Sequence, residues 1–253
     1  MLVAERQQNI VEMVNERKSI RVTELSRIFS VTEETIRRDL EKLEKEGKLS
    51  RSHGGAISVT SPDSLEVPYF EREIMNVNEK REIAVEAVKQ VAEGDKLILD
   101  ASTTAWYMAK SLPNISLTIL TNSIKVAMEL SSKHQITVIS TGGILLSESL
   151  SFVGPLAEDS LDNYHVKKAF ISCKGLHLDH GISESNEQQA RMKKKMIQSA
   201  DNVYLMIDHS KFGIQTFSHI SNLGMINHII ADGKVDGRFI KQLKDKSLHL
   251  IKV

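Results

Sequence analysis

The sequence predicts an α/β protein with two parts: an N-terminal winged helix-turn-helix and a C-terminal domain built on a largely parallel sheet. Short amphipathic segments precede Gly47, and a basic segment ending at Gly54-Gly55 follows them, which predicts the first part. From Asn78 onward, runs of β-branched residues alternate with segments of helical period, which predicts the second. At 253 residues the chain is long enough for one small and one medium domain.

The N-terminal elements each have a local signal. An apolar stripe predicts a first helix from about Ala4 to Asn15, and the alternation around Arg21 predicts a short strand. Thr23 is expected to cap a second helix, and Ser30-Val31 to form the tight turn after it. The apolar residues behind these predictions are Ile10, Val11, Val14, Ile20, Val22, Leu25, Ile28 and Phe29.

The segment from Val31 to Ala56 predicts a third helix and a wing. Thr32 is the expected N-cap, and Ile36, Leu40 and Leu43 fall on one side of the helix. Arg38 lies near the opposite side. After Gly47, the polar side chains of Lys48, Arg51 and His53 surround a short hairpin that turns at Gly54-Gly55.

This layout is typical of a helix that reads double-stranded DNA and a wing beside it. Residues 1–60 carry a net charge of only +1, so charge alone does not identify a DNA-binding domain. We expect base contacts from Glu34, Thr35 and Arg38, and phosphate contacts from Arg37, Lys48 and Arg51. With the cap Thr32 and with His53, which we expect along the backbone or minor groove, these are the candidate DNA-binding residues.

Composition excludes several other classes of protein. The single cysteine, Cys173, excludes a disulfide framework and is expected in the core or a pocket wall. The nine histidines show no metal-ligand spacing, so we expect neither a metal nor a cofactor. No apolar run approaches about 18 residues, and the N-terminus lacks a signal sequence. We therefore expect a cytoplasmic protein without a membrane span.

The expected domains are a winged helix-turn-helix over residues 1–57, a linker over 58–77 and an α/β domain over 78–253. The linker prediction depends on lost periodicity and on Pro62 and Pro68. Tyr69 and Phe70 are expected to dock on the second domain.

Strands and helices alternate through the second domain. After a helical face between Ile83 and Val91, the expected strands are Lys96–Leu99, Leu117–Leu120, Ile136–Ile139, Lys168–Ser172, Val203–Ile207 and Ile226–Ile230. The expected helices between and after them are Thr104–Ser111, Ile124–Ser131, Pro155–Leu161, Gln188–Ala200 and Gly237–Lys244.

Small and polar residues follow the strands, at the sheet edge where α/β domains bind ligands. Their chemistry fits a phosphorylated polyol: a helix start and a Gly-Gly pair for an anion, lysines for a phosphate, and side-chain oxygens for hydroxyls. The candidate effector-binding residues are Asp100, Ser102, Thr103, Thr104, Asn122, Ser123, Thr141, Gly142, Gly143, Lys174 and Lys211. Asp208 is a further candidate for hydroxyls, and the run Lys193 to Lys195 is expected mainly to be a solvated face.

Several motifs closely resemble the DeoR family. In order they are TELSRIFSVT, ETIRRDL, L-x-R-x-HGGA, LDASTT, TNS, STGG, SFVGPLA and DHSKFG. The resemblance implies a bacterial regulator of sugar metabolism, most often a repressor. It also implies a sensor domain that is related to the ribose-5-phosphate isomerase and glucosamine-6-phosphate deaminase folds and binds phosphorylated sugars. Two positions depart from the common pattern: Gln189 stands where many members carry Glu, and Lys174 where a smaller residue is common.

The leading hypothesis is a repressor of a sugar-catabolic operon that a phosphorylated sugar releases from its operator. An activator with the same architecture is the alternative, as is a sugar-phosphate isomerase with an accessory DNA-binding domain, for which we find no acid and base pair. LDASTTAWYMAK and STGGILL resemble members linked to rhamnose utilisation, which implies a ketose 1-phosphate such as rhamnulose 1-phosphate. A homo-oligomer is expected, because helix-turn-helix proteins gain affinity from paired half-sites.

Overall fold

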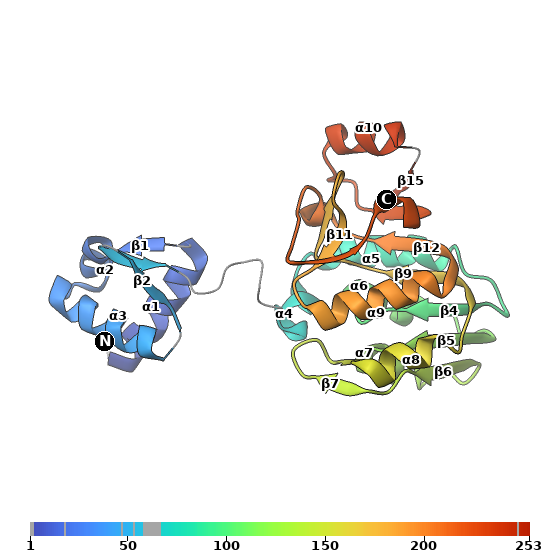
Figure 1. Ribbon diagram of the computed structural model, residues 1–253, viewed down its shortest axis with the longest axis horizontal. Coiled ribbons are helices and arrows are strands. Elements are labelled where there is room, and N and C mark those ends of the chain that lie inside the picture. The colour runs from blue at the N-terminus through green and yellow to red at the C-terminus, as the bar shows by residue number, and fades with distance from the viewer. Residues whose placement is uncertain (1–2, 18, 47, 53, 58–66, 247) are drawn as a thin grey trace. The chain divides into compact units, whose positions relative to one another are not determined.

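The structure is a computed structural model that describes residues 3–17, 19–46, 48–52, 54–57, 67–246 and 248–253 (Figure 1). The chain divides into two compact units, one within residues 1–65 and the other within 66–253. Each unit has its own hydrophobic core. Among the described residues, no helix has the length and apolarity needed to span a bilayer.

The N-terminal unit is a winged helix-turn-helix, as predicted. Its elements are α1 (Val3–Arg17), β1 (Ser19–Arg21), α2 (Val22–Phe29), α3 (Glu33–Lys45), β2 (Ser50–Ser52) and β3 (Gly55–Ile57). The three strands form an antiparallel sheet in the order β1-β3-β2, so the wing hairpin pairs with the strand that precedes α2.

The turn between α2 and α3 has the expected geometry, but one expected cap is wrong. Ser30 adopts a left-handed conformation with φ 52°, and the Thr32 hydroxyl accepts a hydrogen bond of 3.3 Å from the Thr35 amide. The second helix, however, starts at Val22 rather than after Thr23, and its N-cap, Arg21, forms no capping hydrogen bond through its side chain. Val22 enters the core instead, so burial of an apolar side chain sets this helix start.

A buried polar contact fixes α1 against α3. Arg6 Nε donates to Asp39 Oδ2 at 2.7 Å, and Gln7 Nε2 donates to Asp39 Oδ1 at 2.8 Å. Asp39 is only 4% exposed. Both carboxylate oxygens are therefore satisfied away from water, on the side of α3 that also buries Ile36 and Leu40.

The second unit is a seven-stranded parallel sheet with helices on both faces (Figure 1). In sheet order its strands are β15 (His249–Lys252), β14 (His228–Ala231), β12 (Ala200–Met206), β9 (Val166–Ile171), β4 (Lys96–Leu99), β5 (Leu117–Thr121) and β6 (Ile136–Ser140). Every pairing between neighbours is parallel. The predicted fold class is thus confirmed.

Alternate residues of each strand face different cores. Leu97 and Leu99 pack with α5 (Val77–Val88), α6 (Thr103–Ser111) and α7 (Ile124–Leu130). Ile98 faces the other side, with α8 (Pro155–Leu161), α9 (Glu187–Gln198) and α10 (Gly237–Asp245). This division follows from the two-residue period of a strand, which points successive side chains to opposite faces.

Several short strands were not among the expected elements. The edge strand β15 is one. The others are the hairpin β7 (Ile144–Leu146) and β8 (Ser151–Val153), and the antiparallel set β10 (Gly175–His177), β11 (Gly181–Glu184) and β13 (Ser218–Ser221). Runs of three or four residues carry too little periodicity to be separated from loops.

The second half of the expected linker is instead part of the second unit. Residues 58–66 lie outside the described part of the chain, but Tyr69–Ile74 form helix α4. Tyr69 is 1% exposed, its amide donates to the Glu148 carbonyl at 2.7 Å, and Tyr107 Oη donates to the Glu73 carbonyl. Phe70, which was also expected to dock, is 63% exposed.

We predict that Asp39→Ala strongly destabilises the N-terminal unit. The substitution leaves the Arg6 guanidinium buried without its carboxylate, a loss that typically costs about 3–5 kcal/mol. Hydrogen exchange of the α3 amides measures this cost directly in the full chain. Glu41→Ala, which removes an exposed carboxylate from the same helix, is the control and should leave α3 protection close to wild type. Equal protection in the two variants would contradict the role given to Asp39.

Candidate functional site

The exposed side of α3 carries the residues predicted to read DNA. The side chain of Arg38 is 79% exposed and that of Glu34 62%, and their closest N–O distance is 3.5 Å. Arg37 contacts Glu33 at 2.8 Å and Glu34 at 3.7 Å. These arginines are therefore paired along their own helix, and DNA phosphates or bases must compete with carboxylates for them.

Two of the three predicted wing residues are among the residues that the structure describes, and they lie near α3. Arg51 lies in β2, where its amide donates to Glu44 Oε1 of α3 at 2.7 Å. Lys48 is exposed and pairs with Glu46 at 2.8 Å. His53 falls outside the described residues, so its predicted contact stays a prediction. Thr32 and Thr35 lie together at the start of α3, with their hydroxyl oxygens 2.9 Å apart.

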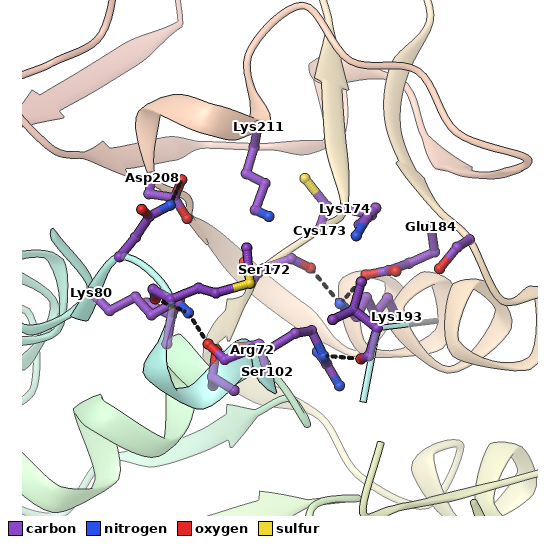
Figure 2. A pocket seen from close by; sticks show the side chains of 16 residues that line it. Arg72, Lys80, Ser102, Ser172, Cys173, Lys174, Glu184, Lys193, Asp208 and Lys211 are labelled. Carbon is purple, nitrogen blue, oxygen red and sulfur yellow. Dashed lines mark hydrogen bonds and ion pairs between the residues drawn. The ribbon is translucent and has the colours of Figure 1, made fainter. Parts of the chain in front are cut away.

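The second unit contains a solvent-open cavity at the carboxyl ends of three central strands (Figure 2). Its volume is about 680 Å³ when the open solvent at its mouth is counted. Ser102 follows β4, Ser172 follows β9 and Asp208 follows β12. These strands are neighbours in the sheet, which explains why residues far apart in sequence meet here.

Positive side chains dominate the cavity. They come from five different places in the chain and are Arg72, Lys80, Lys174, Lys193 and Lys211. Figure 2 shows Lys211 reaching toward the cavity from a segment opposite α4 and Arg72. Two carboxylates, Glu184 and Asp208, also line it. The arrangement suits a ligand that combines negative charge with hydroxyl groups.

Lys193 is the centre of the buried charge network. Its Nζ donates to Glu184 Oε1 at 2.6 Å and to the Ser172 carbonyl at 2.7 Å, and lies 3.2 Å from Asp100 Oδ2. Burial alone would lower the pKa of Lys193, but the charges of Glu184 and Asp100 outweigh burial and raise it. Lys193 is thus a permanent cation. Of the run expected to be a solvated face, Lys194 is exposed as predicted, whereas Lys193 is buried.

Asp100 lies beneath the cavity and holds its walls together. Its Oδ1 accepts from the Ser102 amide at 3.1 Å and its Oδ2 from the Ser172 amide at 2.8 Å. The side chain is fully buried, so these amides and Lys193 occupy the oxygens that we expected to bind sugar hydroxyls. In this structure Asp100 positions the residues around the cavity.

The start of α6 faces the cavity. Ser102 caps the helix by accepting from the Ala105 amide at 3.0 Å, and Thr103 and Thr104 line the cavity beside it. The first amides of a helix have no acceptor within the helix and mark its positive end. Ser102, Thr103, Thr104, Lys174 and Lys211 are therefore brought together, as the sequence predicted.

Asp208 contributes a charged oxygen to the same space. Burial would raise the pKa of Asp208, but Lys211, hydrogen bonds from Ser210 and the nearby Lys80 hold it below its ordinary value. Its Oδ1 also accepts from Asn76 Nδ2 at 3.0 Å. Asp208 remains a carboxylate at neutral pH and can accept hydrogen bonds from a polyol.

Besides the buried Asp100, five predicted residues do not line the cavity: Asn122, Ser123, Thr141, Gly142 and Gly143. They follow β5 and β6, and β6 is an edge strand two places from β4, roughly 10 Å away at the usual spacing of strands. The sequence does not reveal the order of strands in the sheet, so the prediction assigned the residues after every strand to a single site.

Three of these five residues make local contacts that need no ligand, namely the Asn122 amide nitrogen, the Ser123 hydroxyl and Gly143. Asn122 Nδ2 donates to the Phe152 carbonyl at 3.0 Å, and the Ser123 hydroxyl caps α7. Gly143 has φ 111°, and a Cβ there would lie 2.6 Å from the Val153 carbonyl oxygen. That glycine is required for close packing of the β7–β8 hairpin, rather than for the approach of a ligand that we predicted.

Sequence reasoning missed Arg72, Asn76, Lys80, Glu184 and Ser185. The first two lay in the expected linker, and Glu184 ends a strand that was not expected. A signal existed for Lys193, because Gln189, Lys193 and Ile197 recur every four residues on the buried side of α9. Gln189 itself donates to the hydroxyls of Ser149 and Ser151, so it is satisfied away from the cavity.

Two family models match the two units. The model of the DeoR C terminal sensor domain matches residues 75–233, and that of the DeoR-like helix-turn-helix domain matches residues 6–62. The chain belongs to the DeoR family. It is a transcriptional regulator of sugar metabolism that binds DNA through its helix-turn-helix, not an isomerase.

This DeoR-family regulator is similar to several named relatives over nearly its whole length. The uncharacterized HTH-type transcriptional regulator YulB of Bacillus subtilis is 62% identical over 100% of this chain and 98% of that protein. The L-fucose operon activator of Haemophilus influenzae is 37% identical, covering 90% of this chain and 91% of that one. The HTH-type transcriptional repressor GlcR of Bacillus subtilis is 34% identical, covering 99% and 96%.

A solved structure of ribose 5-phosphate isomerase A from Methanocaldococcus jannaschii is also similar to part of the regulator. The match has a TM-score of 0.41 and 19% identity, and it covers 54% of this chain and 55% of that chain. None of the relatives named here gives support to a rhamnose-specific assignment.

We predict that Lys193→Met destabilises the sensor domain by about 3–5 kcal/mol, because it leaves Asp100 and Glu184 without their buried counter-ion. Urea unfolding followed by the fluorescence of Trp106, the only tryptophan, reports this domain alone. Lys194→Met removes the neighbouring exposed ammonium and should unfold at the wild-type urea concentration. Identical midpoints for the two variants would show that the buried network does not stabilise the domain.

We also predict slow alkylation of Cys173. The thiol is 4% exposed, and burial, with a smaller effect of Glu184, raises the pKa of Cys173 to about 12. Since the thiolate is the reactive form, iodoacetamide at pH 8 should label the folded chain far more slowly than the chain in urea. Mass spectrometry of the intact protein measures both rates, and comparable rates would contradict the buried position.

Proposed function

We propose that this DeoR-family regulator represses a sugar-catabolic operon and is released from its operator by a phosphorylated sugar bound in the cavity of the second unit. The observation that carries the proposal is the cavity itself, where five cationic side chains and a helix start surround a space that two carboxylates also line. A sugar phosphate supplies both the anion and the hydroxyls that this lining suits.

The lining divides into two kinds of contact. The start of α6, with Lys211 nearby in the cavity, offers amides and a positive charge to a phosphate. Asp208 and Glu184 offer oxygens that accept hydrogen bonds from hydroxyls. Lys174, at the cavity wall, is a candidate for either end of the ligand.

The DNA contacts depend on a few placed residues, because the N-terminal unit has little net charge. Arg38, Thr35 and Glu34 are proposed to face the bases, and Arg37, Lys48 and Arg51 the phosphates. On binding, Arg37 and Arg38 each give up an ion pair with a glutamate of their own helix and form a contact with DNA instead. Two copies of the chain are proposed to bind paired half-sites, which supplies affinity that one near-neutral unit lacks.

Activation of transcription is the second candidate function, because the named relatives include both kinds of regulator: GlcR is a repressor and the L-fucose protein is an activator. Both candidates share the same ligand site. They differ in where the operator lies relative to the promoter. The effector in either case is proposed to be a ketose 1-phosphate such as rhamnulose 1-phosphate.

A panel of sugar phosphates tests the effector. We expect one phosphorylated sugar, and not its unphosphorylated form, to raise the melting temperature of the full chain and to weaken its binding to DNA. A ligand at 100 times its Kd stabilises the folded state by about 2.7 kcal/mol. If no phosphorylated sugar changes the affinity for a DNA duplex that the protein itself selects from a random library, the induction model is wrong.

The same selected duplex tests the DNA contacts. Arg38→Ala should weaken binding by about 1–3 kcal/mol and relax base preference at one position of each half-site. Arg17→Ala removes the same charge from an exposed position of α1 and is the matched control. Fluorescence anisotropy gives both affinities, and a repeated selection gives both preferences. An Arg38→Ala protein with wild-type affinity and preference would remove Arg38 from the interface.

A further inference from the structure

Helix α4 lies in the chain between the segment that joins the two units and the residues that line the cavity. It is the first helix after residues 58–66, which join the two units, and it packs on the second unit through Tyr69. Its C-terminal end leads into α5 through Met75 and Asn76, both of which line the cavity. Asn76 has φ 48°, a left-handed conformation that is uncommon outside glycine. The α4–α5 junction, Met75-Asn76, is therefore both strained and adjacent to the ligand space.

Lys80 holds the end of α4 from inside the cavity. Its Nζ donates to the Met75 carbonyl at 2.6 Å and also to the Arg72 carbonyl (Figure 2). Carbonyls at the end of a helix lack partners within it and carry its negative pole. The Lys80 ammonium, 5% exposed on α5, therefore caps α4 with a charge that no carboxylate neutralises by direct contact among the described residues.

Two more cavity residues hold the same short segment. Arg72 Nε donates to the Val67 carbonyl at 2.8 Å and lies over the Tyr69 ring at 5.8 Å. Asp208 Oδ1 accepts from Asn76 Nδ2 at 3.0 Å. Every one of these contacts joins a residue that lines the cavity to the backbone or side chain of residues 67–76.

A phosphate in the cavity competes for these donors. A phosphate oxygen carries a negative charge that a carbonyl oxygen lacks, so it adds a Coulomb attraction to its hydrogen bonds with Lys and Arg. Burial lowers the pKa of Lys80 to about 8, with Lys211 and Arg72 adding to the effect against the opposing charge of Asp208. The ammonium thus gains from an added negative charge more than a solvated lysine does.

We propose that Lys80 and Arg72 are ligand-binding residues, and that their transfer from the carbonyls of Val67, Arg72 and Met75 to a bound phosphate loosens α4 and the α4–α5 junction. This inference rests on the proposed function, since it takes a phosphorylated ligand to bind in the cavity. Helix α4 and the α4–α5 junction are then the part of the second unit that responds when the cavity is occupied. The loosened helix is the one joined directly to the segment that leads to the DNA-binding unit.

Hydrogen exchange of the full chain tests the proposal with inorganic phosphate as the probe. Phosphate at a concentration that saturates its effect on the melting temperature should accelerate exchange of the amides of residues 69–76 by about fivefold to thirtyfold, the factor that corresponds to losing one or two net hydrogen bonds. In Lys80→Met the same amides should exchange rapidly without phosphate and change little when it is added. Phosphate should still raise the melting temperature of that variant through Lys211 and α6.

Lys89→Met is the matched control, because Lys89 ends the same helix as Lys80 but pairs with Glu86 at the surface. It should behave as wild type in both measurements. Lys80→Gln replaces Lys80→Met if that variant does not fold. If neither variant folds, hydrogen exchange of residues 69–76 in the wild-type protein, with and without phosphate, is sufficient to test the proposal.

The outcomes separate this inference from the proposed function. If phosphate fails to raise the wild-type melting temperature, the anion site is wrong and both proposals fall. If phosphate raises it but exchange in residues 69–76 is unchanged or slower, the release of α4 is overturned and the sugar-phosphate site stands. Wild-type protection of α4 in Lys80→Met would also overturn the release, because Lys80 would then not be what holds the helix.

Discussion

The ligand cavity depends on one buried interaction, the pair between Asp100 and Lys193. Asp100 directly follows the central strand β4. Lys193 lies on α9, which covers the face of the sheet opposite to the one that α6 covers. The carboxylate also accepts the amides of Ser102 and Ser172, so a single side chain fixes the start of α6 to the end of β9. Without Lys193 that carboxylate would be a bare charge in the interior, which explains why both residues are buried together.

The same physical constraint appears in the N-terminal unit on a smaller scale. Asp39 is satisfied by Arg6 and Gln7, and it fixes the helix that carries the exposed arginines. In both units a buried carboxylate orients a helix whose free end or free side is proposed to face a negatively charged ligand. The residues proposed to bind DNA or the ligand are distinct from the carboxylates that position them.

Much of the fold was predictable from sequence because long apolar periods specify long elements. The bounds of the six expected strands of the sheet agree with the observed bounds to within three residues, and the expected elements of the winged helix-turn-helix are present. The strand order and the short strands were not predictable, because neither leaves a periodic pattern in one sequence. This limit explains why the predicted residues Ser102 and Lys211 line the cavity, whereas Thr141 and Gly142 follow another strand and do not.

Several residues that line the cavity were missed for a related reason. Arg72 and Lys80 bind backbone carbonyls, and nothing in a local pattern marks such a contact. Lys193 is a charged residue at a buried helical position, which pattern analysis treats as an exception although a buried partner makes it favourable.

The separation between the buried floor and the accessible rim of the cavity has an evolutionary consequence. Asp100 and Lys193 belong to the buried framework whatever ligand is present, whereas Lys174 and Lys211 are partly exposed at the rim of the cavity. Rim residues can therefore be exchanged one at a time with little loss of stability. A regulator built in this way can acquire a new inducer by gradual substitution while its framework and its control of transcription persist.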